Sequence, residues 1–260
     1  MRNFLTLVLL IILGTLAAQA YIPPTDFILV RTAENTPRVS LTVEYAVEFE
    51  NGSHQFSTRE SWIFADNGQM KLKVSQGFQL DIAYTPAERV FQDKQSRKTQ
   101  KLSSEFLERF HFLKTPEAFS KMMLDQGITR ERMQAPVLSR GGGVVNYGFF
   151  DRVASVGGQR QSELLFPGMW IEQDQFLFRQ MRFRSQSLFQ VEEYQQVGKF
   201  FFPKLKSIAW GKNQVRIKTI SVTERKTIRP QDFNVESYLD LSAVPAEIKP
   251  TVLEFYSRFR

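Results

Sequence analysis

The sequence predicts a mainly β protein of the α+β class. Its fold is expected to be a curved antiparallel sheet that forms an incomplete β-barrel, covered by a few helices acting as a lid. Residues 161–224 contain apolar segments of roughly 8–12 residues separated by polar or glycine-containing breaks, a spacing typical of an antiparallel meander. Residues 39–49 alternate strictly between apolar and polar side chains, as in a strand with one buried face. Helical patterns lie mainly between these two regions, so the helices should cover the sheet.

The first 20 residues have the pattern of a secretory signal peptide. A short basic start containing Arg2 precedes an apolar run over residues 4–13, and Ala18-Gln19-Ala20 is a small-x-small cleavage site. The apolar run is too short to cross a bilayer comfortably, and no later segment approaches the ~18 apolar residues of a membrane helix. Residues 21–260 are therefore expected to be one soluble periplasmic domain, with a helical insertion at about 103–135.

The amino-acid composition and net charge of the chain indicate which kinds of molecule it is expected to bind. The chain has 260 residues, no cysteine, 24 phenylalanines and a formal net charge of +7. An exported protein without disulfides needs a large core, and the phenylalanines can supply either that core or an apolar cavity. The positive charge favours anionic lipid headgroups or acidic proteins over nucleic acid. Because the basic residues are dispersed, a solvated strand face explains most of them.

The N-terminal half is predicted to make its strands locally. A helix should begin at Thr25 or Asp26 and end near residue 35. The strand at 39–49 is followed by Asn51-Gly52, a type I′ turn signal, and by a partner strand at 56–64. A turn at 66–68 and strands at 70–74, 78–84 and 89–93 extend the meander.

The predicted lid follows. Residues 94–102 are interpreted as a polar linker, and Ser103 or Ser104 as the cap of a helix. The apolar stripe of that helix consists of Phe106, Leu107, Phe110 and Leu113. A second helix should begin at Thr115-Pro116 and end at Gly127.

The C-terminal half is predicted to be a bulged meander. Glycines 141–143 are interpreted as a hinge or turn, followed by a strand at 144–154. The apolar parity slips between Phe178 and Met181 and again between Val191 and Tyr194, which indicates a bulge at each point and a curled sheet. A strand at 215–222 and a helix at 245–259 complete the chain.

The sequence offers little chemistry for catalysis. His54 and His111 are the only histidines, and they have neither cysteine partners nor metal-ligand spacing. No Gly-x-Ser-x-Gly motif is present, and the neighbouring carboxylates Glu192 and Glu193 point to opposite faces of a strand. The prediction is therefore a protein that is not an enzyme and has no metal or cofactor.

Several motifs resemble the periplasmic lipoprotein-sorting proteins of the LolA/LolB type. The resemblance rests on Trp170-Ile171-Glu172, Phe176-Leu177-Phe178-Arg179, Tyr194 and Phe202-Pro203, with the hairpin that ends in Trp62-Ile63-Phe64 and residues 232–235 in the same order. It implies an open barrel with a helical lid over an apolar cavity that carries lipid-modified proteins or lipids between membranes. The arginine that latches the lid in that family has no counterpart in this chain, where Ala65-Asp66-Asn67 follow the tryptophan strand. The stress sensor RseB has a similar domain, so the same fold can serve protein binding.

The expected function is a periplasmic carrier or binding protein for the acyl chains of lipid-modified proteins or lipids. The predicted cavity lining is Trp62, Phe64, Phe110, Met122, Met123, Phe176 and Phe178, each of which ordinary core packing would also explain. The expected partners are lipoprotein acyl chains or phospholipid, together with membrane-bound donor and acceptor proteins. Membrane contact would be peripheral only. The alternative is an envelope protein-binding or stress-sensing factor of the same fold without lipid cargo.

Overall fold

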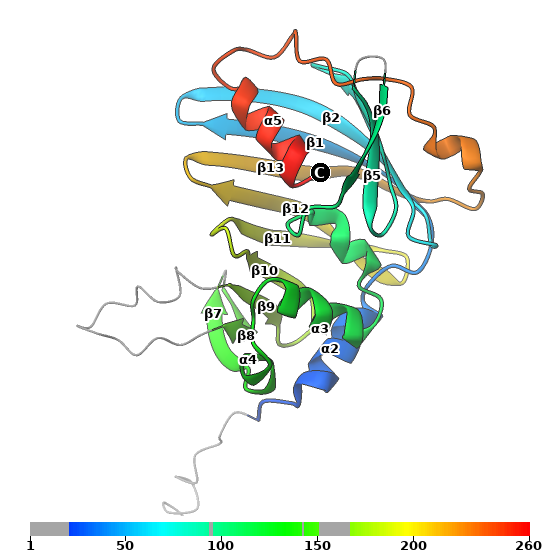
Figure 1. The fold of residues 1–260 in the computed structure, drawn as a ribbon. Coiled ribbons are helices and arrows are strands. Elements are labelled where there is room, and N and C mark those ends of the chain that lie inside the picture. Colours follow the sequence, from blue (N-terminus) through cyan, green and yellow to red (C-terminus); the bar gives the residue numbers. More distant parts are fainter. Residues whose placement is uncertain (1–20, 94–95, 142, 151–166) are drawn as a thin grey trace, which may run out of the picture.

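The structure is a computed structural model that describes residues 21–93, 96–141, 143–150 and 167–260 (Figure 1). The predicted signal peptide, the end of the strand predicted at 144–154 and the start of the stretch 161–224 lie outside these residues. One group of strands, called here the N-arm, comprises β1 (Leu41–Asn51), β2 (His54–Phe64), β3 (Met70–Gln76), β4 (Leu80–Tyr84), β5 (Glu88–Asp93) and β6 (Ser96–Lys101). The C-arm comprises β7 (Val137–Gly141), β8 (Val144–Phe150), β9 (Gly168–Glu172), β10 (Phe178–Arg182), β11 (Leu188–Val197), β12 (Phe200–Trp210) and β13 (Asn213–Glu224).

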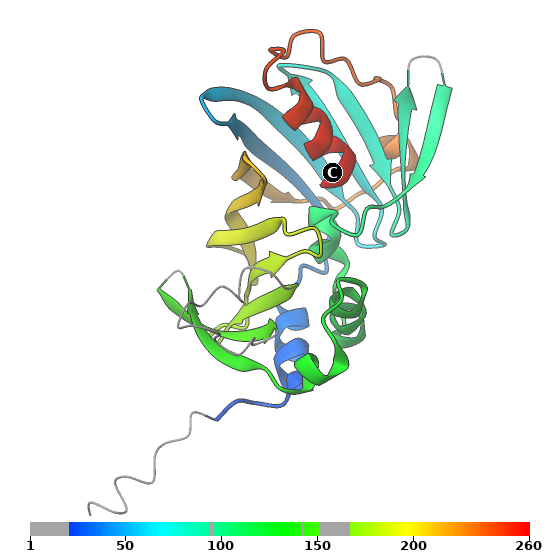
Figure 2. The same cartoon turned by 60° about the vertical axis from the view of Figure 1, so that its left-hand side comes forward.

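The described strands form one antiparallel sheet of thirteen, in the order β6-β5-β4-β3-β2-β1-β13-β12-β11-β10-β9-β8-β7. Within each arm every strand pairs with its neighbour in sequence, and the arms meet where β1 pairs with β13. The edge strands β6 and β7 do not pair with each other, so the sheet curls without closing. The predicted incomplete barrel is confirmed (Figure 2).

The local signals act as expected in both arms. Asn51 pairs with His54 across the first turn, and Gly52 adopts the left-handed φ of +61° that this turn requires. Both predicted bulges are confirmed. The register shifts between Phe178 and Gln180 in the β9–β10 pair, and between Val191 and Tyr194 in the β11–β12 pair.

The helical elements are α2 (Thr25–Glu34), the 3-10 helix η1 (Leu107–Phe112), α3 (Pro116–Asp125), α4 (Arg130–Gln134), the 3-10 helix η3 (Pro230–Phe233) and α5 (Lys249–Arg258). As predicted, α3 begins with proline, and the Thr115 hydroxyl accepts a hydrogen bond from the Ala118 amide at 3.3 Å. Residues 102–136, called here the lid segment, contain η1, α3 and α4. This segment joins the two edge strands of the sheet, β6 and β7.

Two predictions in and around the lid are corrected. The linker predicted at 94–102 is wrong, because Ser96–Lys101 is strand β6 and pairs along β5; its side chains are polar because it is an exposed edge. The helix predicted from Ser103 or Ser104 shrinks to η1, since the Leu107 amide donates to the distant Phe259 carbonyl at 3.1 Å. Gly141 pairs with Val144 in the β7–β8 hairpin, which agrees with the interpretation of this glycine segment as a hinge or turn; Gly142 lies outside the described residues.

The chain after β13 wraps around the N-arm. Asp81 Oδ2 accepts hydrogen bonds from the amides of Glu236 and Ser237 at 3.2 and 3.3 Å, which fixes this strap on the outer face. The strap then returns to the inner face as α5, as the two views show. There Phe255 packs edge-on against Phe49 of β1, with their ring centroids 5.2 Å apart. Thus α5 covers the N-arm, while α2 and the lid segment cover the C-arm.

Candidate functional site

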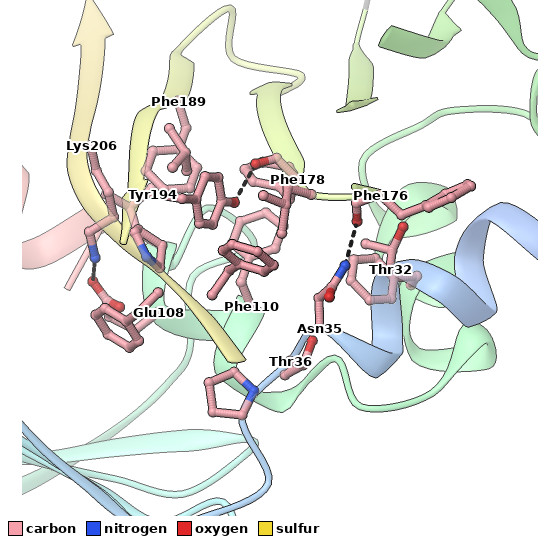
Figure 3. A pocket seen from close by; sticks show the side chains of 18 residues that line it. Thr32, Asn35, Thr36, Glu108, Phe110, Phe176, Phe178, Phe189, Tyr194 and Lys206 are labelled. Carbon is pink, nitrogen blue, oxygen red and sulfur yellow. Dashed lines mark hydrogen bonds and ion pairs between the residues drawn. The ribbon is translucent and has the colours of Figure 1, made fainter. Parts of the chain in front are cut away.

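A cavity of about 70 Å³ lies on the inner face of the C-arm, beneath η1 and the end of α2 (Figure 3). This cavity is called here the slot. It is lined by Thr32, Asn35, Thr36, Pro37, Leu107, Glu108, Phe110, Phe119, Phe176, Leu177, Phe178, Phe189, Val191, Tyr194, Phe201, Phe202, Pro203 and Lys206. Most of these side chains are apolar, and many are aromatic. The slot is therefore suited to hydrocarbon.

Three of the predicted cavity residues meet at the slot. Phe110 comes from η1, Phe176 from the β9–β10 turn and Phe178 from β10. The Phe110 and Phe178 ring centroids are 4.0 Å apart. Phe176 has a left-handed φ of +56°, which is costly for an aromatic residue, and its carbonyl accepts a hydrogen bond from the Asn35 amide group at 3.3 Å. Strained backbone of this kind often marks a functional position.

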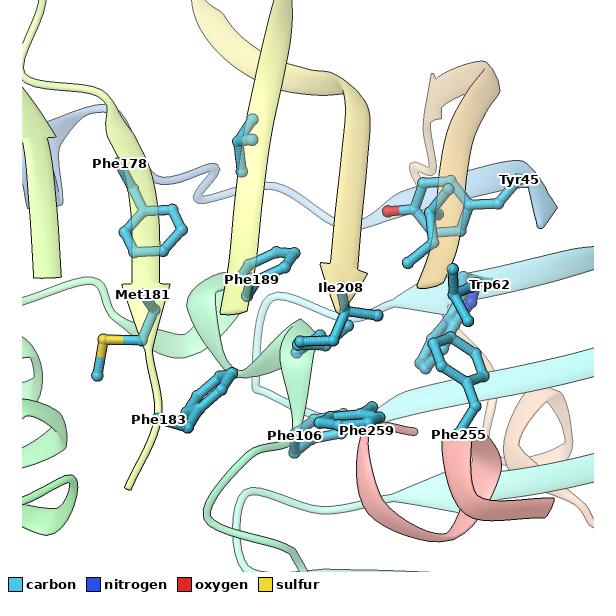
Figure 4. Close-up of a cluster of buried hydrophobic side chains, with 14 of the residues drawn as sticks. Tyr45, Trp62, Phe106, Phe178, Met181, Phe183, Phe189, Ile208, Phe255 and Phe259 are labelled. Atoms are coloured by element: carbon cyan, nitrogen blue, oxygen red, sulfur yellow. The ribbon is translucent and has the colours of Figure 1, made fainter. Parts of the chain in front are cut away.

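The other four predicted residues do not line the slot. Trp62 and Phe64 lie in the N-arm and stack on each other, with ring centroids 5.3 Å apart and planes 2° from parallel. Figure 4 places Trp62 near Phe255 of α5. Met122 and Met123 are buried on α3, within the packing of the lid. The slot is thus formed by the C-arm, the lid segment and the end of α2, whereas Trp62 and Phe64 belong to the core of the N-arm.

The wall of the slot is held in place by polar contacts. The Tyr194 hydroxyl donates a hydrogen bond to the Phe178 carbonyl. The Arg179 guanidinium lies over the Tyr194 ring, 5.3 Å from its centroid, and its Nε donates to Glu172 Oε2 at 2.8 Å. These contacts tie β9, β10 and β11 together where the bulges bend the strands.

The inner end of the slot is ionic. Lys206 Nζ lies 2.8 Å from Glu108 Oε1, and Arg260 Nη1 lies 2.7 Å from the same oxygen. Behind this pair, Arg260 Nη2 is 3.0 Å from Glu60 Oε2. All four side chains are almost completely buried. We call Glu60, Glu108, Lys206 and Arg260 the ionic cluster; in it two carboxylates balance two cations.

Hydrogen bonds and burial shape this cluster further. Glu60 accepts hydrogen bonds from Trp62 Nε1 and from the Tyr256 hydroxyl, both at 2.8 Å. Burial lowers the pKa of Lys206 below its ordinary value, and the Glu108 carboxylate opposes that shift. Burial also raises the pKa of Tyr45, so its hydroxyl stays protonated.

Sequence reasoning missed the ionic cluster because its members are distant in the chain. The sequence nevertheless contains a pattern that indicates buried charges. Glu60 shares its strand face with Trp62 and Phe64, and Lys206 shares one with Ile208. A charged residue on an otherwise apolar strand face points to a buried partner.

Other kinds of site find little support in the part of the chain that the structure describes. No group of three or more histidine, cysteine or acidic side chains in residues 21–93, 96–141, 143–150 and 167–260 is arranged to hold a metal ion. Across those same ranges, no helix has the length and apolar character needed to traverse a bilayer.

Comparison of the sequence with protein-family models and with curated proteins gives no match. Solved structures, however, share the fold. A LolA superfamily protein from Nitrosomonas europaea is 12% identical with a TM-score of 0.54, covering 82% of this chain and 98% of its own. A DUF1329 family protein from Desulfovibrio piger is 7% identical with a TM-score of 0.54, covering 81% and 95%. A putative outer membrane lipoprotein-sorting protein domain from Vibrio parahaemolyticus is 9% identical with a TM-score of 0.51, covering 81% and 96%. The resemblance to LolA-like proteins predicted from the motifs is confirmed for the fold.

Proposed function

We propose that this protein is a periplasmic binding protein or carrier for acyl chains, either those of lipids or those of lipid-modified proteins. The observation that carries the proposal is the aromatic slot between the C-arm and the lid segment. The LolA-like fold supports it, since one protein that shares this fold is described as a putative lipoprotein-sorting protein. The predicted signal peptide and the positive net charge agree with an envelope protein that meets anionic membrane surfaces.

The lid has to move for cargo to bind. The slot measures about 70 Å³, well below the ~300–1,000 Å³ of small-molecule sites. Displacing η1 would remove Leu107 and Phe110 from the slot and extend it toward the apolar face of the C-arm. The structure is therefore the closed state of the proposed carrier.

Burial of an acyl chain offsets the apolar part of the cost of this opening. Each buried methylene contributes roughly 0.8 kcal/mol, so about ten methylenes contribute roughly 8 kcal/mol. Exposing an apolar side chain such as Leu107 or Phe110 costs about 1.5–3 kcal/mol. An acyl chain can therefore replace the apolar side chains of η1 with free energy left to offset its own immobilisation.

The test is to export the full chain with its own leader in a Gram-negative host and purify it from the periplasm without detergent. Native mass spectrometry and lipid extraction should show bound lipid or an acylated protein. The purified protein should also accelerate transfer of a fluorescent phospholipid between vesicles. A protein that is free of lipid and leaves the transfer rate unchanged would contradict the proposal. If that lipid-free protein formed a defined complex with a folded envelope protein, the protein-binding alternative would gain support.

A further inference from the structure

The ionic cluster closes the inner end of the slot with a balance of charge that depends on the lid. Lys206 belongs to β12, Glu60 to β2, and Arg260 follows α5. Glu108 alone belongs to the lid segment, where it lies on η1 with Phe110. Its Oε1 atom receives both Lys206 Nζ and Arg260 Nη1, at 2.8 and 2.7 Å.

Displacement of η1 would therefore withdraw two side chains, Phe110 and Glu108, from the slot at once. The Phe110 ring leaves the apolar part of the slot, and the Glu108 carboxylate leaves its ionic end. Lys206 and Arg260 then face Glu60 alone, which leaves one uncompensated positive charge in a poorly hydrated place. Such a charge is strongly unfavourable unless an anion takes the vacated position.

Tyr45 gives a second, independent indication of an anion site. Its side chain is completely buried, and the Lys206 ammonium lies 4.2 Å from the centre of its ring. Among the described residues, the Tyr45 hydroxyl has no hydrogen-bond partner. A buried donor without an acceptor is unfavourable, so this hydroxyl is available to a ligand oxygen.

We propose that the inner end of the slot binds the anionic end of the cargo, a carboxylate or a phosphate ester, in the position that the Glu108 carboxylate occupies in the closed state. Lys206 and Arg260 would supply charge-assisted hydrogen bonds, while the acyl chain takes the place of Phe110. This inference rests on the proposed acyl-chain function. It favours a fatty acid or an anionic phospholipid over chains attached to a protein through neutral ester and amide bonds.

The test compares three probes with the same alkyl chain: dodecanoate, dodecyl phosphate and dodecanol. Their affinities for the delipidated full-length protein are measured at neutral pH by isothermal titration calorimetry. We expect at least one of the two anions to bind about tenfold more tightly than dodecanol, the size of one charge-assisted contact. A preference for dodecanoate would identify a fatty acid, and a preference for dodecyl phosphate a phospholipid headgroup.

Variants separate the anion site from the stability of the lid. E108Q is expected to bind both the preferred anion and dodecanol more tightly than the wild type, because neither ligand then has to displace the Glu108 carboxylate from Lys206 and Arg260. Unchanged affinities in E108Q would contradict the displacement of Glu108 by the ligand. K206M should bring the ratio of anion to alcohol affinity close to one. K204M is the matched control on the same strand, because Lys204 is exposed and pairs with Glu193 at 2.8 Å.

The results of these titrations also distinguish the anion site from the acyl-chain binding on which it rests. If dodecanol binds the wild type as tightly as both anions, the anion site is overturned and acyl-chain binding stands. If none of the three probes binds, both proposals fail. If K206M does not fold, the ratio of anion to alcohol affinity in the wild type decides the question.

Discussion

The ring of Phe110 in η1 lies on the ring of Phe178 in β10, with 4.0 Å between their centroids. Phe110 also approaches Phe189 of β11, at 5.6 Å. A single side chain of the lid thus packs against two aromatic side chains that line the slot.

Shortening this side chain should make room for cargo. We expect F110A to lower the free energy of unfolding by about 2–4 kcal/mol, because a large apolar side chain is lost from a packed site. It should also raise the affinity for dodecanol, since the ligand no longer has to displace the ring. Calorimetric titration with dodecanol and urea unfolding measure the two effects.

F64A is the control, since Phe64 is equally aromatic but lies outside the slot, stacked on Trp62. It should destabilise the protein without raising the affinity for dodecanol. Equal gains in F110A and F64A would show that general loosening, rather than the slot, governs uptake.

The ionic cluster should show strong coupling between Lys206 and Glu108. Either E108Q or K206M alone leaves a buried charge without its partner, so each should cost about 3–5 kcal/mol of folding free energy. The double variant K206M/E108Q should cost clearly less than the sum of the two single variants, because it restores the charge balance. Urea unfolding of the four proteins completes the cycle, and simple additivity would show that the ion pair contributes no coupling.

The cost of E108Q should depend on pH. The pKa of Lys206 is lowered on folding by burial, with Glu108 and Glu60 opposing the shift and Arg260 adding to it. The unfolded chain therefore binds more protons between the lowered pKa and the ordinary value of 10.5, and stability rises with pH in that window. Removing the Glu108 charge lowers the pKa of Lys206 further and widens the window.

The stability difference between wild type and E108Q should accordingly be largest near neutral pH and shrink toward about pH 10. The burial-raised pKa of Tyr45, which also faces Lys206, keeps its phenol out of this range. Urea unfolding of both proteins across this range measures the trend. A difference that stays constant or grows with pH would contradict the assignment.

Gly148 in the C-arm should resist substitution. Gly148 on β8 pairs with Trp170 on β9, and Trp170 stacks on Phe150 with ring centroids 5.0 Å apart. A Cβ atom on Gly148 would lie 2.3 Å from the Phe150 ring. G148A should therefore cost about 1–3 kcal/mol through overpacking.

Gly141, at the end of the adjacent strand β7, provides the control. A Cβ atom there would have Asn146 Nδ2 as its nearest neighbour, at 3.7 Å, an ordinary van der Waals distance. G141A should consequently leave the melting temperature nearly unchanged. Thermal unfolding of both variants compares them directly, and an equal loss in the two would point to backbone effects rather than aromatic crowding.

Local patterns were sufficient to predict much of this fold. The alternation over residues 39–49 and the Asn51-Gly52 turn fixed β1 and the first hairpin, and the slips in apolar parity located both bulges. These features depend on near neighbours in the chain. Strand β6 could not be predicted in this way, because an exposed edge strand carries the same polar residues as a linker.

The candidate site was predictable only in part, for the same reason. Phe110, Phe176 and Phe178 were identified by their place in apolar strands and stripes, and the structure brings them together at the slot. Trp62 has the same local character, yet α5 covers it, and no local pattern predicts where that helix docks. The ionic cluster arises from contacts between segments distant in sequence, which only the assembled fold reveals.

The lid segment is tethered at both ends, because it joins β6 and β7, the two free edges of the curved sheet. The distance that the lid segment has to bridge is therefore the distance between these two edge strands. If the sheet flattened, its edges would move apart and pull the lid segment away from the inner face; if it curled more tightly, the segment would be free to pack against that face. The curvature of the sheet and access to the slot would then be coupled. A contact that bends either arm from outside would change the position of the lid segment without touching it.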